Sequence, residues 1–313
     1  MMRSIDLASR SPNWWGVGEL AALASAVGWA GTSTALARLG GRYDAPVLSA
    51  MRLLAATPLL LLLLLMDGGF ATLNLGDAPL PAVAMMASGL VGYGIGDTAY
   101  IRALGRVGIQ RMAPTTTALW VAMSAVGGIV LLGEPFGWNL VTGGVLVVVG
   151  CTMVVAKAVA PVATLERPAA TTLEVIGAVT LVAAAWAGAT LLLAGGREEL
   201  STAAAGAIRI PTGGLVIASV TMLATRGAVR RRLPRGRDLA LIVAVGIVGT
   251  GIGSWLYIYS VAEAGAVKAV VLNSTSPLMA IPLSMLFLGE RPTRRIGLGT
   301  VLCVAGTLIV ILG

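Results

Sequence analysis

The chain has 313 residues, of which 57% are apolar and only 12% charged, and its mean hydropathy is +0.90. Soluble domains carry charge on about a quarter of their residues, so this composition excludes a soluble globular protein. The formal net charge of +8 does not indicate a nucleic-acid-binding protein, because the basic residues stand between apolar segments and form no patch on a polar surface.

Two further features of the composition limit the chemistry. The chain has no histidine and only two cysteines, Cys151 and Cys303. Both cysteines lie inside apolar segments, without a CxxC motif or metal-like spacing, so we interpret them as small core residues. Without histidine, the sequence excludes histidine-based zinc sites, general bases and proton relays. We therefore expect neither a metal site nor a cofactor.

Apolar segments of membrane-spanning length recur along the whole chain. A helix needs about 20 apolar residues to cross a bilayer. Segments of about that length cover residues 17–37, 46–66, 81–104, 111–132, 137–156, 173–194, 202–225, 239–260, 267–288 and 294–312. The connections are short, apart from 67–80 and 157–172. The sequence therefore predicts an all-α membrane protein with ten transmembrane helices and no separate soluble domain.

A glycine-rich stretch in the third segment is repeated in the eighth. GLVGYGIGDTAYIRALGRVG at 89–108 returns 157 positions later as GIVGTGIGSWLYIYSVAEAG at 246–265, with nine of twenty positions identical. The flanks are apolar and helix-length, which is not the strand-turn-helix context of a nucleotide-binding fingerprint. Small residues on an apolar helix let neighbouring backbones approach closely in lipid. The stretch therefore predicts a central, tightly packed membrane helix in each half.

The same register relates the rest of the two halves. Arg52 returns as Arg209 157 positions later, and the Gly-Glu pair ending at Glu134 returns 156 positions later at Glu290. We therefore divide the chain into repeats at 17–156 and 173–312. Because each repeat holds five predicted helices, an odd number, the second must enter the membrane from the opposite side. This is the inverted-repeat plan of secondary transporters, whose site lies near the midplane between the halves.

Loop charges predict the orientation. On the face that bears both termini the basic residues are Arg3, Arg10, Arg197 and Lys268. On the other face they are Arg38, Arg42, Arg102, Arg106, Arg111, Lys157, Arg167, Arg226, Arg230, Arg231, Arg232, Arg235, Arg237, Arg291, Arg294 and Arg295. By the positive-inside rule the richer face is cytoplasmic, and both termini lie outside.

The pattern of these motifs resembles a known family. Trp29-Ala30-Gly31 in the first helix, Arg52 opening the second, a glycine-rich third ending in Tyr100 and Gly133-Glu134 closing the fourth are similar to the EamA-type domain of the drug/metabolite transporter superfamily. The resemblance covers both halves and implies ten helices and export of amino acids or other small metabolites. Family members usually keep both termini in the cytoplasm, whereas the loop charges here place them outside.

Two arginines and one aspartate lie deep in the predicted helices. Asp97 lies about seven residues, or roughly 10 Å, from the end of its helix, and Arg52 lies at nearly the same depth on the antiparallel second helix. Since a charge at such depth needs a partner, we predict an Arg52–Asp97 ion pair. In the second half the arginine persists as Arg209, but the acid has become Ser254. Arg209 is therefore a candidate anchor for an anionic group of the substrate; alternatively, it reaches the interface and pairs with Glu198, Glu199 or Glu263.

A polar run in the ninth helix predicts the centre of the substrate site. Asn273, Ser274, Thr275 and Ser276 precede Pro277 near the middle of the segment. Pro277 lacks an amide hydrogen, so we expect the helix to kink there and the polar groups to line a cavity. Neutral donors and acceptors suit a zwitterion or polar metabolite; a structural kink braced by hydroxyl groups is the alternative. Further substrate-binding candidates are Thr116, Trp120, Tyr100 and Tyr257.

Two glutamates and two tryptophans occupy equivalent positions in the repeats. Glu134 and Glu290 stand just ahead of the next helix, where a carboxylate complements the positive end of the helix dipole; a role in ion coupling is the alternative. Trp29 and Trp186 lie in mid-helix, away from the membrane interface. We interpret them as packing at the repeat axis, with cavity lining as the alternative.

These features favour a secondary transporter and not an enzyme. We expect export of small polar metabolites such as amino acids across the cytoplasmic membrane by alternating access, with the lipid bilayer and a small-molecule substrate as partners and no nucleic acid. No GxxxxGK[ST] motif is present, which speaks against direct ATP coupling. Proton coupling through Asp97, Glu134 or Glu290 stays open. The alternatives are an importer of the same fold and an intramembrane enzyme acting on lipid-linked substrates.

Overall fold

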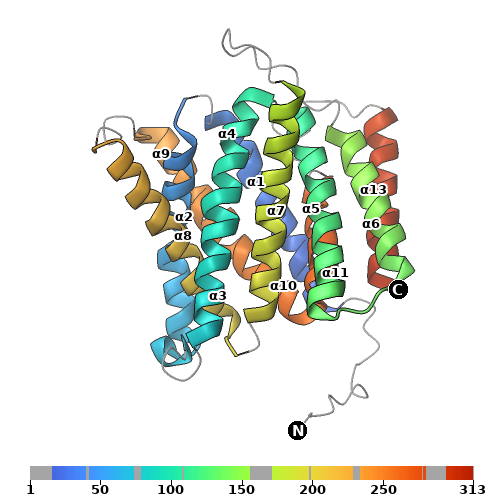
Figure 1. Ribbon diagram of the computed structural model, residues 1–313, viewed down its shortest axis with the longest axis horizontal. Coiled ribbons are helices and arrows are strands. Elements are labelled where there is room, and N and C mark those ends of the chain that lie inside the picture. The colour runs from blue at the N-terminus through green and yellow to red at the C-terminus, as the bar shows by residue number, and fades with distance from the viewer. Residues whose placement is uncertain are drawn as a thin grey trace.

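The computed structural model describes residues 16–39, 42–73, 79–107, 109–155, 171–196, 199–227, 233–276, 278–279 and 294–312. Every regular element in these ranges is helical, as predicted, and the helices stand side by side in one bundle (Figure 1). The elements of the first half are α1 Val17–Leu39, α2 Ala45–Met66, η2 Gly69–Leu73, α3 Pro79–Gly89, η3 Leu90–Asp97, α4 Thr98–Val107, α5 Ile109–Leu132 and α6 Trp138–Val155. Those of the second half are α7 Thr172–Gly196, α8 Thr202–Ala224, α9 Gly236–Val245, η5 Gly246–Ile252, α10 Gly253–Ala264, α11 Ala266–Asn273 and α13 Arg294–Leu312.

The bundle presents an apolar belt to its surroundings. Within the described ranges, 6 helices are long and apolar enough to cross a membrane: Ala45–Met66, Pro79–Leu104, Thr115–Leu132, Thr172–Gly196, Thr202–Ala224 and Gly236–Ala264. Two shorter apolar helices, Trp138–Met153 and Gly297–Leu312, accompany them. These helices make the chain a multi-pass membrane protein, and the full set of ten spans stays a prediction.

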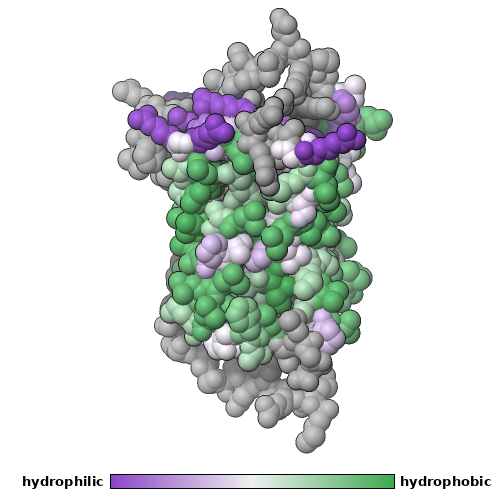
Figure 2. All heavy atoms as spheres, turned by 90° about the vertical axis from the view of Figure 1, so that its left-hand side faces the viewer, coloured by the Kyte–Doolittle hydropathy of each residue, from purple (hydrophilic) through white to green (hydrophobic). Residues whose placement is uncertain are grey.

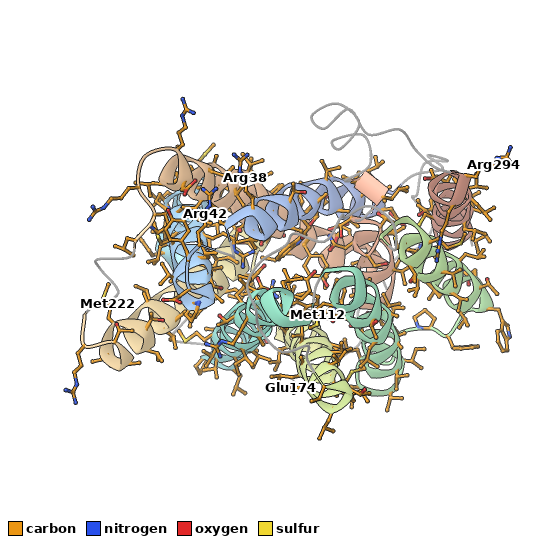
Figure 3. The ribbon with its side chains drawn as sticks, turned by 90° about the horizontal axis from the view of Figure 1, so that it is seen from above. Arg38, Arg42, Met112, Glu174, Met222 and Arg294 are labelled. Carbon is orange, nitrogen blue, oxygen red and sulfur yellow. The ribbon has the colours of Figure 1, made fainter. Side chains whose placement is uncertain are left out.

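Charged side chains gather at one end of this belt (Figure 2). Seen from above in Figure 3, Arg38 and Arg42 extend close to each other, and Arg294 extends at the opposite edge. Arg42 Nη1 lies 3.5 Å from Asp238 Oδ2, and the Tyr43 hydroxyl donates a 2.8 Å hydrogen bond to the same oxygen. This hydrogen bond raises the pKa of Tyr43. The contacts join the α1–α2 connection of the first half to α9 of the second.

Equivalent helices of the two halves run antiparallel. On α6 and α13, a methyl group at Gly143 would lie 2.7 Å from the carbonyl oxygen of Gly306, and one at Gly150 would lie 2.7 Å from the amide nitrogen of Cys303. Residue numbers rise along one helix as they fall along the other. Because Gly143 and Gly150 correspond to Gly299 and Gly306 at the offset of 156, the packing of α6 on α13 repeats itself under an approximate two-fold axis perpendicular to the helices.

The glycine-rich stretches pack closely, as predicted, but not as regular α-helix. In each half they form a π-helical turn, η3 in the first half and η5 in the second. A methyl group at Gly92 would lie 2.8 Å from Ala189 Cβ, and one at Gly96 would lie 2.8 Å from Trp186 Cδ1. These distances are shorter than a side chain tolerates, so the glycines allow α7 of the other half to approach. π-Helical turns are rare and are frequently found at functional sites.

Candidate functional site

Each of the two deep arginines lies where a helix of its own half crosses a helix of the other half. Arg52 lies seven residues after the start of α2, and Arg209 seven residues after the start of α8. A methyl group at Gly246 would lie 2.6 Å from the carbonyl oxygen of Arg52, and one at Gly89 would overlap the carbonyl oxygen of Arg209. Both crossings therefore require glycine. Since Arg52 corresponds to Arg209 and Gly89 to Gly246, the two crossings are related by the same two-fold axis as α6 and α13.

Arg52 is neutralised within its own half. Arg52 Nη2 and Asp97 Oδ2 form an ion pair whose side chains are 0% and 5% exposed. The predicted pairing is thus present in the structure. The second carboxylate oxygen, Asp97 Oδ1, accepts a 2.8 Å hydrogen bond from Trp186 Nε1 of α7. The sequence predicted packing or cavity lining for Trp186 and did not predict this hydrogen bond. Both oxygens of Asp97 are therefore engaged by the protein.

Aromatic rings surround the Arg52 guanidinium. Its central carbon lies 5.5 Å from the ring centroid of Trp29 and 5.9 Å from that of Tyr93. The two rings are stacked, with centroids 6.3 Å apart and planes 9° apart. A cation over an aromatic face is attracted to the ring's negative charge distribution, and burial strengthens this attraction. Trp29 and Tyr93 therefore hold the arginine in place together with Asp97.

Arg209 has a different environment, although its position is equivalent. Its Nε donates a 2.8 Å hydrogen bond to Ser88 Oγ, which in turn donates to the Ala189 carbonyl oxygen at 2.6 Å. Its guanidinium carbon lies 4.9 Å from the centroid of Tyr93, and the residue is 4% exposed. Arg209 is thus buried in the bundle and does not extend to the interface. Of the three acids considered as interfacial partners, Glu198 lies outside the described residues, and neither Glu199 nor Glu263 forms an ion pair with Arg209.

Ser254, the residue equivalent to Asp97, also contacts Tyr93. Ser254 Oγ and the Tyr93 hydroxyl are 2.6 Å apart and hydrogen-bonded, and both residues are buried. Tyr93 itself corresponds to Thr250 in the other half. One tyrosine therefore lies beside both arginines and is hydrogen-bonded to the serine that stands in place of a second aspartate. Tyr93 was not among the residues predicted from the sequence. Its position in the glycine-rich stretch, where the other repeat has Thr250, was the available signal.

Several buried donors at this centre have no hydrogen-bond partner in the described part of the protein. They are Arg52 Nε and Nη1, Arg209 Nη1, Thr116 Oγ1, Trp120 Nε1 and Thr250 Oγ1. Leaving a buried polar group unpaired costs about 1–3 kcal/mol. With two guanidinium groups and one carboxylate, the cluster also carries a net positive charge. The arrangement is suited to binding a group that accepts hydrogen bonds and is negatively charged.

The predicted aromatic candidates lie around α7. The ring of Trp186 is 5.1 Å from that of Tyr100 and 5.7 Å from that of Trp120, measured between centroids. The Tyr257 hydroxyl lies 2.9 Å from Thr190 Oγ1, one turn along α7 from Trp186. The structure therefore brings Tyr100, Trp120 and Tyr257 to the same interior region as the two arginines. Thr116 is buried one turn before Trp120 on α5.

The polar run of the ninth predicted helix makes internal contacts. Asn273 Nδ2 donates to Ser25 Oγ at 2.9 Å, whereas the Ser274 and Thr275 hydroxyls donate to carbonyl oxygens three residues earlier, at 2.7 Å each. α11 ends at Asn273, four residues before the predicted kink, and Pro277 lies outside the described residues. Hydroxyls bonded in this way brace a helix end. These contacts agree with the structural alternative, and a substrate role for the run, Ser276 included, stays a prediction.

Glu134 corrects one expectation about helix capping. The sequence predicted that its carboxylate would face the helix that follows it, α6. Instead Oε1 accepts a 2.6 Å hydrogen bond from the Ala266 amide and Oε2 a 2.9 Å bond from the Val267 amide, at the start of α11 in the other half. The prediction was wrong about the helix because a local pattern carries no information on a partner 132 residues away. Glu290, the equivalent residue, lies outside the described residues.

Nearby, a second contact links the halves at the same end. Lys268 Nζ of α11 lies 3.1 Å from Glu19 Oε1 of α1. Both side chains are partly buried. No group of three acidic or cysteine side chains in the described ranges stands close enough together to hold a metal ion. The contacts that these residues make are ionic and hydrogen-bonding contacts between the two halves.

Two related halves of apolar helices with a buried charged centre define a multi-pass helical membrane protein of duplicated construction. A sequence profile of the EamA-like transporter family matches residues 16–156 and again residues 174–312. The chain therefore belongs to the EamA-like transporter family, and the resemblance seen in its motifs is confirmed.

Comparison with solved structures agrees with this fold. A structure titled only "Crystal structure of protein" superposes with a TM-score of 0.75, covering 94% of this chain and 96% of the other, at 17% sequence identity. At that identity the similarity concerns the fold alone. No curated protein sequence matches the chain.

Proposed function

We propose that this member of the EamA-like transporter family is a secondary transporter with ten transmembrane segments, arranged as two inverted repeats at 17–156 and 173–312. It moves small polar metabolites, the class that the family resemblance implied, across the cytoplasmic membrane by alternating access, in the direction of export. The substrate binds between the halves, close to Arg52 and Arg209.

One observation carries this proposal: two equivalent arginines are buried where the halves cross, each against a glycine of the opposite half. Charged side chains inside a membrane are rare because they are costly, and those that occur commonly mark a transport pathway. The interface between inverted repeats is also where secondary transporters bind their substrates. The arginines thus combine the chemistry and the location expected of such a site.

Contacts at the two ends of the bundle support an alternating movement. At the arginine-rich end, Tyr43 and Arg42 of the first half hold Asp238 of the second. At the opposite end, Glu134 holds the start of α11, and Glu19 holds Lys268. Each set consists of a few hydrogen bonds and ion pairs, which can break without disturbing the packed helices. Opening one set at a time would expose the centre to one side of the membrane and then to the other.

The two described carboxylates that could carry a coupling proton are both held by hydrogen-bond donors. Asp97 is held by Arg52 and Trp186, and Glu134 by two backbone amides. A proton carried by either carboxylate would displace these donors. Coupling through Asp97 or Glu134 therefore requires these contacts to break during the cycle, and Glu290 is the remaining candidate.

The experiment is solute counterflow with the purified protein in liposomes. Vesicles are loaded with unlabelled candidates from several classes (amino acids, monocarboxylates, nucleosides, sugars and polyamines), and uptake of the labelled compound is followed without ATP. We expect saturable exchange for one class and none in protein-free vesicles. Absence of exchange for every class by folded protein, together with turnover of a lipid-linked substrate, would favour the intramembrane enzyme instead.

A further inference from the structure

The two halves differ at one charged position close to the buried arginines. Arg52 and Arg209 are equivalent, but Asp97 in the first half corresponds to Ser254 in the second. Arg52 therefore has an acidic partner, whereas among the described residues Arg209 has only the neutral Ser88 hydroxyl and the ring of Tyr93. From this asymmetry we infer that the transported substrate is an organic monoanion without a cationic group, and that its carboxylate binds Arg209 as Asp97 binds Arg52. The inference rests on the proposed function and names the substrate class of the same site.

Charge balance at the centre favours a monoanion over a zwitterion. Both oxygens of Asp97 are already engaged, by Arg52 and by Trp186. An ammonium group entering the site would find no free carboxylate among the described residues of this cluster. A single carboxylate would bring the sum over two guanidinium groups and Asp97 to zero. Burying an unpaired charge in a region of low dielectric constant is strongly unfavourable, so the neutral combination is preferred.

The described protein atoms use only part of the hydrogen-bonding capacity of the Arg209 guanidinium. Nε is used by Ser88, and the face of the group lies over Tyr93. Nη1 has no hydrogen-bond partner among the described protein atoms. Beside Nη2 stands Gly92, where a methyl group would lie 3.6 Å away, so no side chain from this position covers the nitrogen. Two terminal nitrogens of an arginine match the two oxygens of a carboxylate, which makes a bidentate contact the expected one.

The surroundings of this guanidinium are aromatic. The Ser88 hydroxyl donates a hydrogen bond to the Ala189 carbonyl oxygen. The hydroxyl of Thr190, the next residue on α7, is hydrogen-bonded to the Tyr257 hydroxyl. Tyr93 lies over the guanidinium, Tyr257 contacts α7 one residue beyond the Ser88 contact, and Trp186 lies one turn from Thr190 on the same helix. Large aromatic surfaces with single polar tips bind the apolar part of a small molecule well. The remainder of the substrate is thus expected to be apolar or aromatic.

Thermal unfolding of the purified protein in detergent tests the inference with defined probes. The probes are propionate, lactate, benzoate and 3-phenylpropionate, each compared with its neutral amide, together with 3-phenylpropylamine and phenylalanine as the cation and zwitterion of one skeleton. We expect at least one carboxylate to raise the melting temperature in a saturable manner. Its amide, the amine and the zwitterion should give no comparable shift.

Variants assign the binding to Arg209. Arg209→Gln should weaken binding of the stabilising carboxylate by about tenfold or more, as expected for loss of a charged hydrogen-bond partner. Arg209→Lys, which keeps the charge but loses the bidentate geometry, should retain part of the affinity. Arg38→Gln, on an exposed arginine at the end of α1, is the control and should bind as the wild type does. The melting temperature of each variant without ligand shows that it is folded.

The outcomes separate this inference from the proposed function. Three results would contradict the inference that the substrate is a monoanion. They are stabilisation by the amine or the zwitterion as strong as that by the carboxylate, unchanged binding in Arg209→Gln, and no stabilisation by any carboxylate. Counterflow of a zwitterion that persists in Arg209→Gln would likewise remove the inference while the transporter function stands. A carboxylate that binds through Arg209 but is never exchanged would leave the site intact and contradict the function.

Discussion

Arg52 lies in the first half of the molecule and Arg209 in the second, and both contact the ring of Tyr93. The ring centroid is 5.9 Å from the guanidinium carbon of Arg52 and 4.9 Å from that of Arg209. Of these two arginines, only Arg52 has a carboxylate partner in the part of the chain that the structure describes. Equivalent residues have thus taken different roles: Arg52 is part of the framework, and Arg209 is available to a ligand.

Arg52→Gln is expected to destabilise the protein. The substitution leaves the buried Asp97 carboxylate without its cation, and breaking one partner of a buried ion pair typically costs about 3–5 kcal/mol. Equilibrium unfolding in mixed detergent micelles measures the free energy of unfolding. The double variant Arg52→Gln/Asp97→Asn should recover part of the loss, because it removes the uncompensated charge. If Arg52→Gln alone is as stable as the wild type, the ion pair does not stabilise the fold.

Gly89→Ala should disrupt the crossing of α3 with α8. The added methyl group would overlap the carbonyl oxygen of Arg209, which is backbone and cannot rotate away. Overpacking of this kind costs about 1–3 kcal/mol or more. Gly188→Ala is the matched control, because its added methyl group would meet no atom within 4 Å apart from those of its own stretch of helix, and alanine favours a helix by up to about 1 kcal/mol. Equal stability of the two variants in the same unfolding assay would contradict the close crossing.

Glu134→Gln should loosen the start of α11. The carboxylate accepts hydrogen bonds from two backbone amides at a helix N-terminus, whereas the neutral amide offers one oxygen and no negative charge. We expect a loss of about 1–2 kcal/mol of local stability, seen as faster hydrogen exchange at Ala266 and Val267. Glu199→Gln, an exposed acid at the same end, serves as the control. Unchanged exchange at these two amides would exclude Glu134 as the cap of α11.

Topology is tested by reporter fusions after Phe70, Ala160 and Arg230. The inverted arrangement places the reporters after Ala160 and Arg230 on one face and the reporter after Phe70 on the other. By the loop charges, the face of Ala160 and Arg230 is cytoplasmic. A shared location for Phe70 and Arg230 would contradict the inverted repeats. An external reporter after Arg230, with Phe70 opposite, would reverse the orientation and keep the fold.

The repeat made much of the fold predictable from sequence. Helix positions followed from apolar length, and the offset of 157 between Arg52 and Arg209 identified residues that the structure places at equivalent crossings. The π-helical turns η3 and η5 could not be predicted, because an extra residue in a helical turn leaves no mark in an apolar, glycine-rich pattern. Glycine spacing indicated close packing but not the hydrogen-bond pattern.

For the site, depth in the membrane was the informative quantity. It predicted the Arg52–Asp97 pair, because a buried charge requires a partner at its own depth. It could not predict Trp186 as the second donor to Asp97, nor α11 as the helix capped by Glu134. Both contacts join the two halves, and a sequence read along one half does not contain the relative placement of the other.

The most direct test of the central claim compares Arg209→Gln with Arg52→Gln in counterflow and in unfolding, together with Ser254→Asp. Arg209→Gln should abolish exchange of the substrate and leave the free energy of unfolding close to that of the wild type, because it removes a buried charge that no described acid balances. Ser254→Asp should also abolish exchange, since the new carboxylate would occupy Arg209, whereas Ser254→Asn should not. Full exchange by Arg209→Gln, or by Ser254→Asp, would contradict the assignment of Arg209 as the substrate anchor.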